Sequence, residues 1–282
     1  TIGESPFSEC KSVQKIEIVS DKFNTPDQLV LCENDKFLFY SPYNQKDEYE
    51  IQEGITKICK FAFHNCNFLR ILTIPESVSI IDDYAFYQNE KLIRLIMISN
   101  KITYIGNYAF YYCYTLETFN IPDTIEYIGD HAFQHCSSLY DPKLPENLKY
   151  IGEYAFANCF RLHNITWPNS ITTIKKSTFE GCRSLTYVDL PEKLTTIETR
   201  AFLQCIYMLS FTINGNNKYF RSENGILYSY DKKRLLFYPP LLRNFEIENT
   251  VTTIDDYACG FSLVENVVLP SNIKILNEGA FY

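Results

Sequence analysis

Ten cysteines are the residues with the widest chemical range in this sequence, because a thiol can form a disulfide, bind a metal or act as a nucleophile. Thiols stacked one turn apart lie near disulfide range, but parallel side chains in a packed core do not meet the Cβ and torsional requirements. Cys10 lies in the same phase, and Cys32 is the thiol that we expect to be exposed. We therefore predict a buried ladder of free thiols, and the cysteines in one phase are Cys66, Cys113, Cys136, Cys159, Cys182 and Cys205.

His131 and His135 are four residues apart and precede Cys136, a spacing that could place two metal ligands on one helical face. Zinc needs four converging ligands, which a linear ladder does not supply. His135 also falls where other turns have a polar surface residue, so we expect neither a metal nor any other cofactor. The residues in that slot elsewhere are Asn65, Gln88, Asn158 and Gln204.

Catalytic motifs are missing from the rest of the sequence. No glycine-rich phosphate loop or GxSxG elbow occurs, and His64 and His163 have no partner at nucleophile spacing. The carboxylate pairs at 82–83 and 255–256 fall at the entry to a turn, where solvated acidic residues are expected. We expect a non-enzymatic protein.

Asn164-Ile165-Thr166 is the one glycosylation sequon, and it falls in a predicted strand. The motif is short, so we interpret it as a chance occurrence. A glycan on Asn164 would obstruct the face of that strand.

The cysteines and several of the other residues named above occur at fixed places in a sequence motif that repeats along the chain. Ala-Phe, Cys and Pro return in a fixed frame, and a period of 20 to 29 residues indicates a leucine-rich-repeat solenoid. One turn cannot bury its own apolar side, whereas stacked turns can. The phenylalanines that mark the phase, 23 or 24 residues apart, are Phe63, Phe86, Phe110, Phe133, Phe156, Phe179 and Phe202.

The unit around Phe156 predicts three short pieces. Residues 162–167 read as a strand that Pro168 ends, and Leu148 and Ile151 lie on a second extended piece. The run IGEYAFANC from Ile151 is predicted to begin a helical turn, with an acidic residue three before the Phe complementing its positive end. The expected fold is an α/β solenoid of about 23-residue repeats with a parallel concave sheet.

The period is interrupted twice. We predict insertions within about 19–50 and 214–245, each with a β-hairpin formed by apolar runs on either side of a polar turn. Residues 1–282 are expected to form a single solenoid. Because the chain starts and stops inside a repeat, we expect it to be a fragment of a longer array.

This pattern resembles the BspA-type leucine-rich repeats, whose unit runs L-x-x-I-x-I-P-x-x-[VL]-x-x-I-G-x-x-A-F-x-x-C. LETFNIPDTIEYIGDHAFQHC, residues 116–136, matches it almost letter for letter. The resemblance covers essentially the whole chain, and members of that family are surface and secreted proteins, several of them adhesins. It implies a cell-surface or secreted protein-binding module whose partner is a protein or glycoprotein of a matrix or of another cell.

The net charge of the chain limits the classes of partner that it can bind. A net charge of −8 disfavours nucleic acid and anionic membranes, which need a basic patch, and no apolar run is long enough to span a bilayer. An intracellular scaffold of the same shape is the alternative, since a ladder of buried thiols is compatible with either compartment.

The partner is expected on the two outward positions of each concave strand. Ile71, Leu95 and Met97 would form an apolar cluster there, with Tyr187 as a second contact, unless the first insertion folds over the cluster. The predicted binding residues are Ile71, Thr73, Leu95, Met97, Thr118, Asn120, Asp141, Lys143, Asn164, Thr166, Tyr187 and Asp189.

Overall fold

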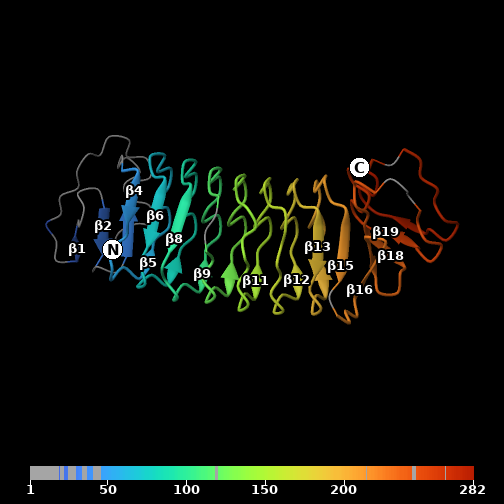
Figure 1. The fold of residues 1–282 in the computed structure, drawn as a ribbon, viewed down its shortest axis with the longest axis horizontal. Helices are drawn as coiled ribbons and strands as arrows, with labels where there is room; N and C mark the ends of the chain where they lie inside the picture. The colour runs from blue at the N-terminus through green and yellow to red at the C-terminus, as the bar shows by residue number, and fades with distance from the viewer. Residues whose placement is uncertain are drawn as a thin grey trace.

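The computed structural model describes residue 19 and the ranges 22–24, 30–33, 37–40, 46–117, 120–213, 215–242, 246–263 and 265–282. The turns stack one after another along the long axis, so that neighbours in space are neighbours in the sequence (Figure 1). The described ranges contain strands and turns but no α-helix. The described ranges form a parallel β-solenoid, and the helical part of the predicted α/β class is not confirmed.

Two-residue strands form one side of the stack, which we call the short-strand side. In most of these strands the second residue points into the core, as Ile81, Ile105 and Ile128 do, whereas Leu276 in the last one is exposed. Five of them pair in parallel: β5 (Lys57–Ile58), β7 (Ile80–Ile81), β9 (Tyr104–Ile105), β10 (Tyr127–Ile128) and β11 (Tyr150–Ile151). Two further parallel pairs are β12 (Thr173–Ile174) with β14 (Thr196–Ile197), and β19 (Thr253–Ile254) with β20 (Ile275–Leu276).

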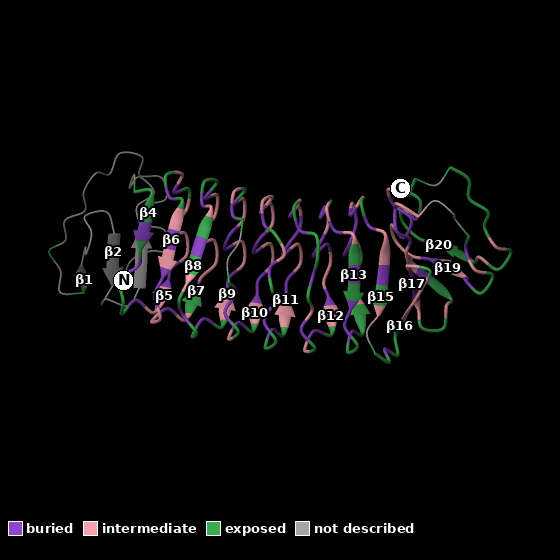
Figure 2. Ribbon diagram, viewed as in Figure 1, coloured by how far each residue is buried: buried purple, intermediate pink, exposed green. Residues whose placement is uncertain are grey.

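Longer strands form a second side, which we call the strand face. Buried and exposed residues alternate along these strands, as Figure 2 shows for β13, because successive side chains point to opposite faces. One parallel group is β4 (Glu48–Glu50), β6 (Ile71–Ile74) and β8 (Arg94–Met97), and the other is β13 (Tyr187–Leu190) with β15 (Ser210–Ile213).

The strand predicted over 162–167 is not formed, and neither is its counterpart one turn earlier. Asp141 has a φ of 32°, outside the range of a strand, and Pro142 has no N–H to donate. The carboxylate of Asp141 accepts the N–H groups of His163 and Asn164 at 2.7 and 2.9 Å. A side chain thus takes the place of the backbone carbonyl, and the sheet is interrupted in the middle of the strand face.

The Ala-Phe run forms a double turn rather than a helix. Tyr84 and Gln88 have φ values of 58° and 59°, in the left-handed region that a right-handed helix excludes. The N–H of Tyr87 bonds within the turn to Tyr84 at 3.1 Å, whereas the N–H of Phe86 bonds to Ala109 of the next turn at 2.7 Å. Half of the turn's N–H groups therefore link one turn to the next.

Side chains of the phase-marking phenylalanines fill the centre of the stack. All seven are buried, and consecutive ring centroids lie 4.8–5.6 Å apart. Stacked rings at this separation combine a large buried apolar area with favourable aromatic geometry. The predicted phase of the core is confirmed.

Both ranges predicted to hold insertions contain three antiparallel strands followed by a parallel pairing. In the first range, β1 (Phe23–Asn24), β2 (Val30–Glu33) and β3 (Phe37–Tyr40) are antiparallel, and β3 pairs in parallel with β5. In the second, β16 (Phe220–Glu223), β17 (Ile226–Ser229) and β18 (Arg234–Phe237) are antiparallel, and β18 pairs in parallel with β19. That they interrupt one continuous solenoid stays a prediction.

Candidate functional site

The in-phase cysteines that the structure describes are free, buried thiols. Each thiol from Cys113 to Cys205 donates to the carbonyl of a Phe at 3.2–3.3 Å, and burial raises the pKa of these thiols. A thiol with a raised pKa is a weak nucleophile and metal ligand. The ladder is structural as predicted, while Cys10 and the side chain of Cys32 lie outside the described residues.

His131 and His135 belong to aromatic stacks. The His131 ring lies between Tyr108 and Tyr154, with centroids 4.4 and 4.8 Å away, and His135 lies 4.4 Å from Tyr112. Within the ranges that the structure describes, no three His, Cys, Asp or Glu side chains converge as metal ligands do. The pair is thus held by ring packing.

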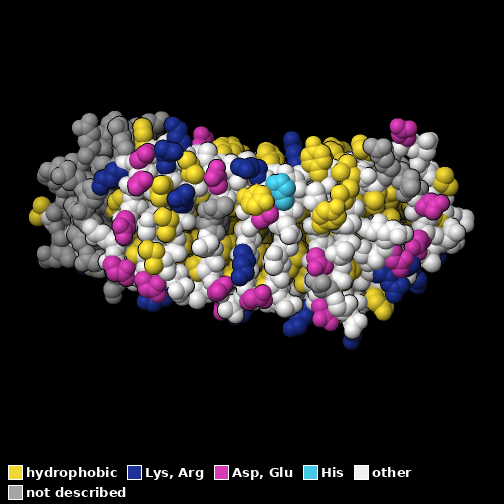
Figure 3. Space-filling view, viewed as in Figure 1, with side chains coloured by type: hydrophobic (Ala, Val, Ile, Leu, Met, Phe, Trp, Pro, Cys, Tyr) yellow, Lys and Arg dark blue, Asp and Glu magenta, His cyan; other side chains and the backbone are white. Residues whose placement is uncertain are grey.

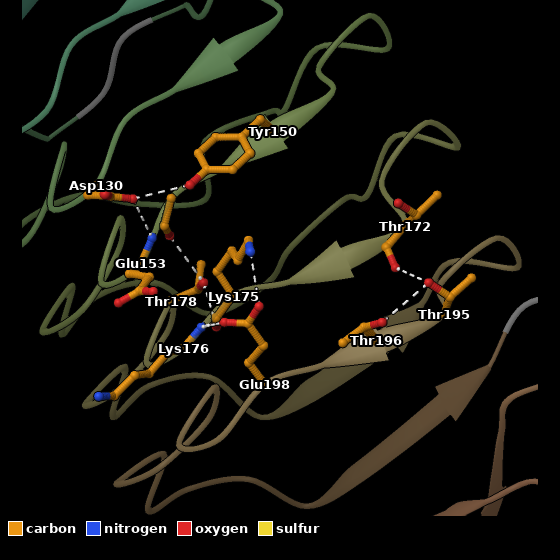
Figure 4. A network of polar contacts seen from close by, with 11 residues as sticks. Asp130, Tyr150, Glu153, Thr172, Lys175, Lys176, Thr178, Thr195, Thr196 and Glu198 are labelled. Carbon is orange, nitrogen blue, oxygen red and sulfur yellow. Dashed lines mark hydrogen bonds and ion pairs between the residues drawn. The ribbon is translucent and has the colours of Figure 1, made fainter.

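Two of the acidic residues before the double turns, Asp83 and Asp130, bind the backbone of the next turn. Asp130 Oδ1 accepts the N–H of Glu153 at 2.9 Å and the hydroxyl of Tyr150 at 3.3 Å (Figure 4). A Cβ on Gly152 would lie 2.4 Å from Asp130 Oδ1, so this close approach requires glycine. Desolvation, with a nearby carboxylate, raises the pKa of the equivalent Tyr104 to about 12. These carboxylates are structural, but they cap turns rather than helices.

The strand face presents two outward rows. Ile71 lies opposite Arg94, and Thr73 lies opposite Ile96. Leu95 is 2% exposed and Met97 packs against the core, so the predicted outward placement of these two residues is wrong.

A misplaced extra residue caused this error. Phe86 and Phe110 are 24 residues apart, and the additional residue lies in the turn after β8, not before it. A shift of one residue moves every side chain of a strand to the other face. The spacing of Met97 and Ile102, one longer than that of Ile74 and Val78, was the available signal.

The other predicted residues lie where the pattern places them. Ile71, Thr73 and Asp141 are half-buried, and Thr118 lies outside the described residues. Asp141 points its carboxylate to the next turn, so it supports the face rather than offering a free anion. The exposed members are Asn120, Lys143, Asn164, Thr166, Tyr187 and Asp189.

Besides Tyr187, which was predicted, the strand face has exposed apolar and aromatic side chains that were not. Ile96 and Ile98 are 40% and 52% exposed beside Arg94, and Tyr140 is 48% exposed. The ring of His163 lies 5.2 Å from that of Tyr140, and Tyr187 is 58% exposed one turn further on. Figure 3 shows hydrophobic side chains among charged ones on the face toward the viewer. This mixture is typical of a contact surface.

None of the segments in the described ranges is a helix both long and apolar enough to cross a bilayer.

Comparison with known proteins agrees with this architecture. Residues 1–102, 33–136, 103–224 and 233–282 match the BspA type leucine rich repeat region, in six copies. No curated protein sequence matches the chain.

Solved structures of bacterial repeat proteins are similar. A leucine rich cell surface protein from Faecalibacterium prausnitzii A2-165 is 26% identical, with a TM-score of 0.80 over 93% of this chain and 74% of that one. A leucine-rich repeat protein from T. pallidum is 28% identical, with a TM-score of 0.54 over 64% of this chain and 86% of that one. One from Bacteroides ovatus ATCC 8483 shares the fold at 22% identity, with a TM-score of 0.63 over 95% of this chain and 62% of that one. The chain belongs to the BspA-type leucine-rich repeat family.

Proposed function

We propose that the chain is a non-enzymatic binding module of a cell-surface or secreted protein, and that it holds a protein or glycoprotein ligand against the strand face. The observation that carries the proposal is the exposure of Ile96, Ile98, Tyr140 and Tyr187 on one side of a rigid stack. Exposed apolar and aromatic side chains on a preformed surface contribute to binding at a smaller ordering cost than those of a segment that must fold on binding.

The corrected site has two parts. Arg94, Ile96 and Ile98 form an apolar and cationic patch at β8, next to Ile71 of β6. Tyr140 and His163 form an aromatic pair over the interrupted part of the sheet, and Tyr187 is exposed on β13, where the sheet resumes. Polar residues between the patches, such as Asn120, Lys143 and Thr166, would supply the hydrogen bonds that fix the register of a ligand.

The surface location rests on the relatives. The Faecalibacterium protein is described as a leucine rich cell surface protein. An intracellular scaffold with the same binding face remains the alternative function, and a matrix protein or a protein of another cell is the proposed partner class.

Site-specific photo-crosslinking tests the face. Benzoylphenylalanine placed at position 98 or 187 should form adducts with surface proteins of intact cells or with matrix proteins. The matched control is position 80, because Ile80 is 38% exposed on the short-strand side. Adducts at 98 and 187 but not at 80 support the proposal. Adducts only at 80, or none with any extracellular protein, contradict it.

A paired substitution adds an affinity measurement. Ile96→Asp with Ile98→Asp should weaken binding of the crosslinked partner at least tenfold, which corresponds to about 1.4 kcal/mol. Ile80→Asp makes the same chemical change outside the face and should leave both binding and Tm unchanged.

A further inference from the structure

The short-strand ladder that joins successive turns, already divided between β11 and β12, stops again after β14 near the C-terminal end of the described chain. One turn earlier, Ile174 O accepts from Glu198 N at 2.9 Å, and Phe179 N donates to Ala201 O at 2.9 Å. The equivalent groups one turn later are Ile197 O and Phe202 N, and neither has a hydrogen-bond partner among the residues that the structure describes. β14 therefore ends its sheet with an open edge.

A cleft of about 370 Å³ lies at this open edge. Its volume falls in the range of about 300–1,000 Å³ that ligand pockets occupy. The N–H of Phe202 belongs to a residue that is only 2% exposed, and buried N–H groups are nearly always paired. The apolar part of the lining is formed by Ile197, Leu227, Leu236 and Phe237.

Arg200 bridges the two walls of the cleft. Its guanidinium lies 4.4 Å from the centroid of the Tyr257 ring, donates to the Tyr257 hydroxyl at 2.5 Å and approaches Glu278 Oε1 at 3.9 Å. These contacts fix the separation of the walls, so the cleft is preformed.

Most charges that line the cleft are already paired. Glu198 accepts from Lys175 Nζ and from the N–H of Lys176, both at 3.0 Å (Figure 4), and Arg234 holds Asp255 with two hydrogen bonds of 2.5 and 3.1 Å. Two charged groups of the lining are not in such pairs, the ammonium of Lys176 and the carboxylate of Asp256. Neither makes a hydrogen bond or an ion pair with another described residue. The cleft thus offers one cation and one anion to a ligand.

We propose that this cleft binds an extended segment of a partner polypeptide, which adds to β14 as a parallel strand. Its N–H groups would donate to Thr195 O and Ile197 O, as those of Thr196 and Glu198 donate to Thr172 O and Ile174 O one turn earlier. A β-branched side chain would lie on the apolar lining, and an acidic and a basic side chain would meet Lys176 and Asp256. A purely apolar ligand would leave the backbone groups of Ile197 and Phe202 unpaired, whereas a strand satisfies a sheet edge. The cleft opens on the short-strand side, so this site is separate from the strand face and independent of the proposed function.

The chain itself supplies a probe. β14 pairs with β12 in the register Thr173 with Thr196 and Ile174 with Ile197. In the chain, residues 193–198 thus form the segment that pairs with the strand of the preceding turn. A free hexapeptide with their sequence, Lys-Leu-Thr-Thr-Ile-Glu, is therefore a suitable strand to pair with β14. Labelled with fluorescein and titrated with the intact chain, it should give saturable fluorescence polarisation.

Two controls separate strand addition from nonspecific adsorption. The same peptide with N-methyl groups on the second Thr and the terminal Glu, the equivalents of Thr196 and Glu198, which donate to Thr172 O and Ile174 O of the preceding turn, has the same side chains but lacks these two donors. It should bind at least tenfold more weakly. Lys176→Glu should lower the affinity for the original peptide several-fold. Replacing the peptide's terminal Glu with Lys should restore the affinity for this variant. Lys143→Glu, on the strand face, should change nothing.

The proposal is overturned if the hexapeptide shows no saturation up to about 1 mM, equivalent to about −4.1 kcal/mol. It is also overturned if the N-methylated peptide binds as well as the parent, since the backbone would then not be recognised and ordered water would satisfy the β14 edge. These two peptide results do not depend on the strand face, so a failure of the crosslinking experiment there would not change them.

Discussion

The side-chain amide of Asn89 donates a hydrogen bond to the carbonyl oxygen of Phe63 at 2.7 Å. The N–H of Cys66 in turn donates to Asn89 Oδ1 at 2.8 Å. One turn later, the thiol of Cys113 performs the first of these roles toward Phe86 at 3.3 Å. From Asn89 to Cys205 this position thus supplies a buried donor to a Phe carbonyl, either an amide or a thiol.

Asn89→Ala should destabilise the fold by about 1–3 kcal/mol, because two buried hydrogen bonds are lost, the one from the Asn89 amide to Phe63 O and the one from Cys66 N–H to Asn89 Oδ1. Asn89→Cys should recover most of the loss, since it restores the donor of the neighbouring turns. Urea unfolding of the three proteins measures the difference. An Asn89→Ala protein as stable as the parent would contradict the role of the hydrogen bond.

The in-phase thiols should be unreactive in the native protein. Burial and a raised pKa both keep Cys136 and Cys159 from reacting as thiolates. Iodoacetamide should label the described cysteines only after unfolding, and mass spectrometry should then find all of them reduced. A disulfide between two in-phase cysteines would contradict the ladder.

Phe156→Ala should lower the free energy of unfolding by about 3–5 kcal/mol. The ring lies between Phe133 and Phe179, with centroids at 5.3 and 5.6 Å, so its removal leaves a cavity bounded by two turns. Tyr140→Ala removes a similar side chain from an exposed position and should cost less than about 0.5 kcal/mol. Equal losses would mean that the Phe column is not the core.

The repeat period and the core residues could be predicted from the sequence, because every turn must bury equivalent side chains against its neighbours. Features that depend on backbone conformation were not predictable in the same way. Tyr84 and Tyr108 are left-handed at φ values of 58° and 55°, although neither residue type signals that conformation, so the double turn resembled a helical one. The break at Asp141 depends on a carboxylate that replaces a carbonyl, and the cleft at β14 depends on how an irregular segment returns to the stack.

Stability should fall as the pH is lowered from about 7 to 5 in part because of His135. Burial lowers the pKa of this imidazole, so the unfolded chain, with a pKa near 6.5, takes up a proton before the folded one does. The stabilising contribution is present above the unfolded pKa and is lost as the pH falls through the folded pKa. His135→Asn suits the φ of 64° and has no titrating group, so its Tm should vary less over this range. Calorimetry at several pH values checks this, and parallel curves for both proteins would contradict it.

The register of β8 gives the sharpest test of the corrected strand face. Leu95 and Ile96 are adjacent and nearly equal in size, but one is 2% exposed and the other is 40% exposed. Leu95→Asp would place an unpaired carboxylate in the core and should cost at least about 4 kcal/mol, whereas Ile96→Asp should stay within about 1 kcal/mol of the parent. Thermal unfolding of the two variants decides between the two registers. If Leu95→Asp folds normally and Ile96→Asp does not, the strand has the opposite register, and the apolar patch of the proposed binding face would again consist of Leu95 and Met97.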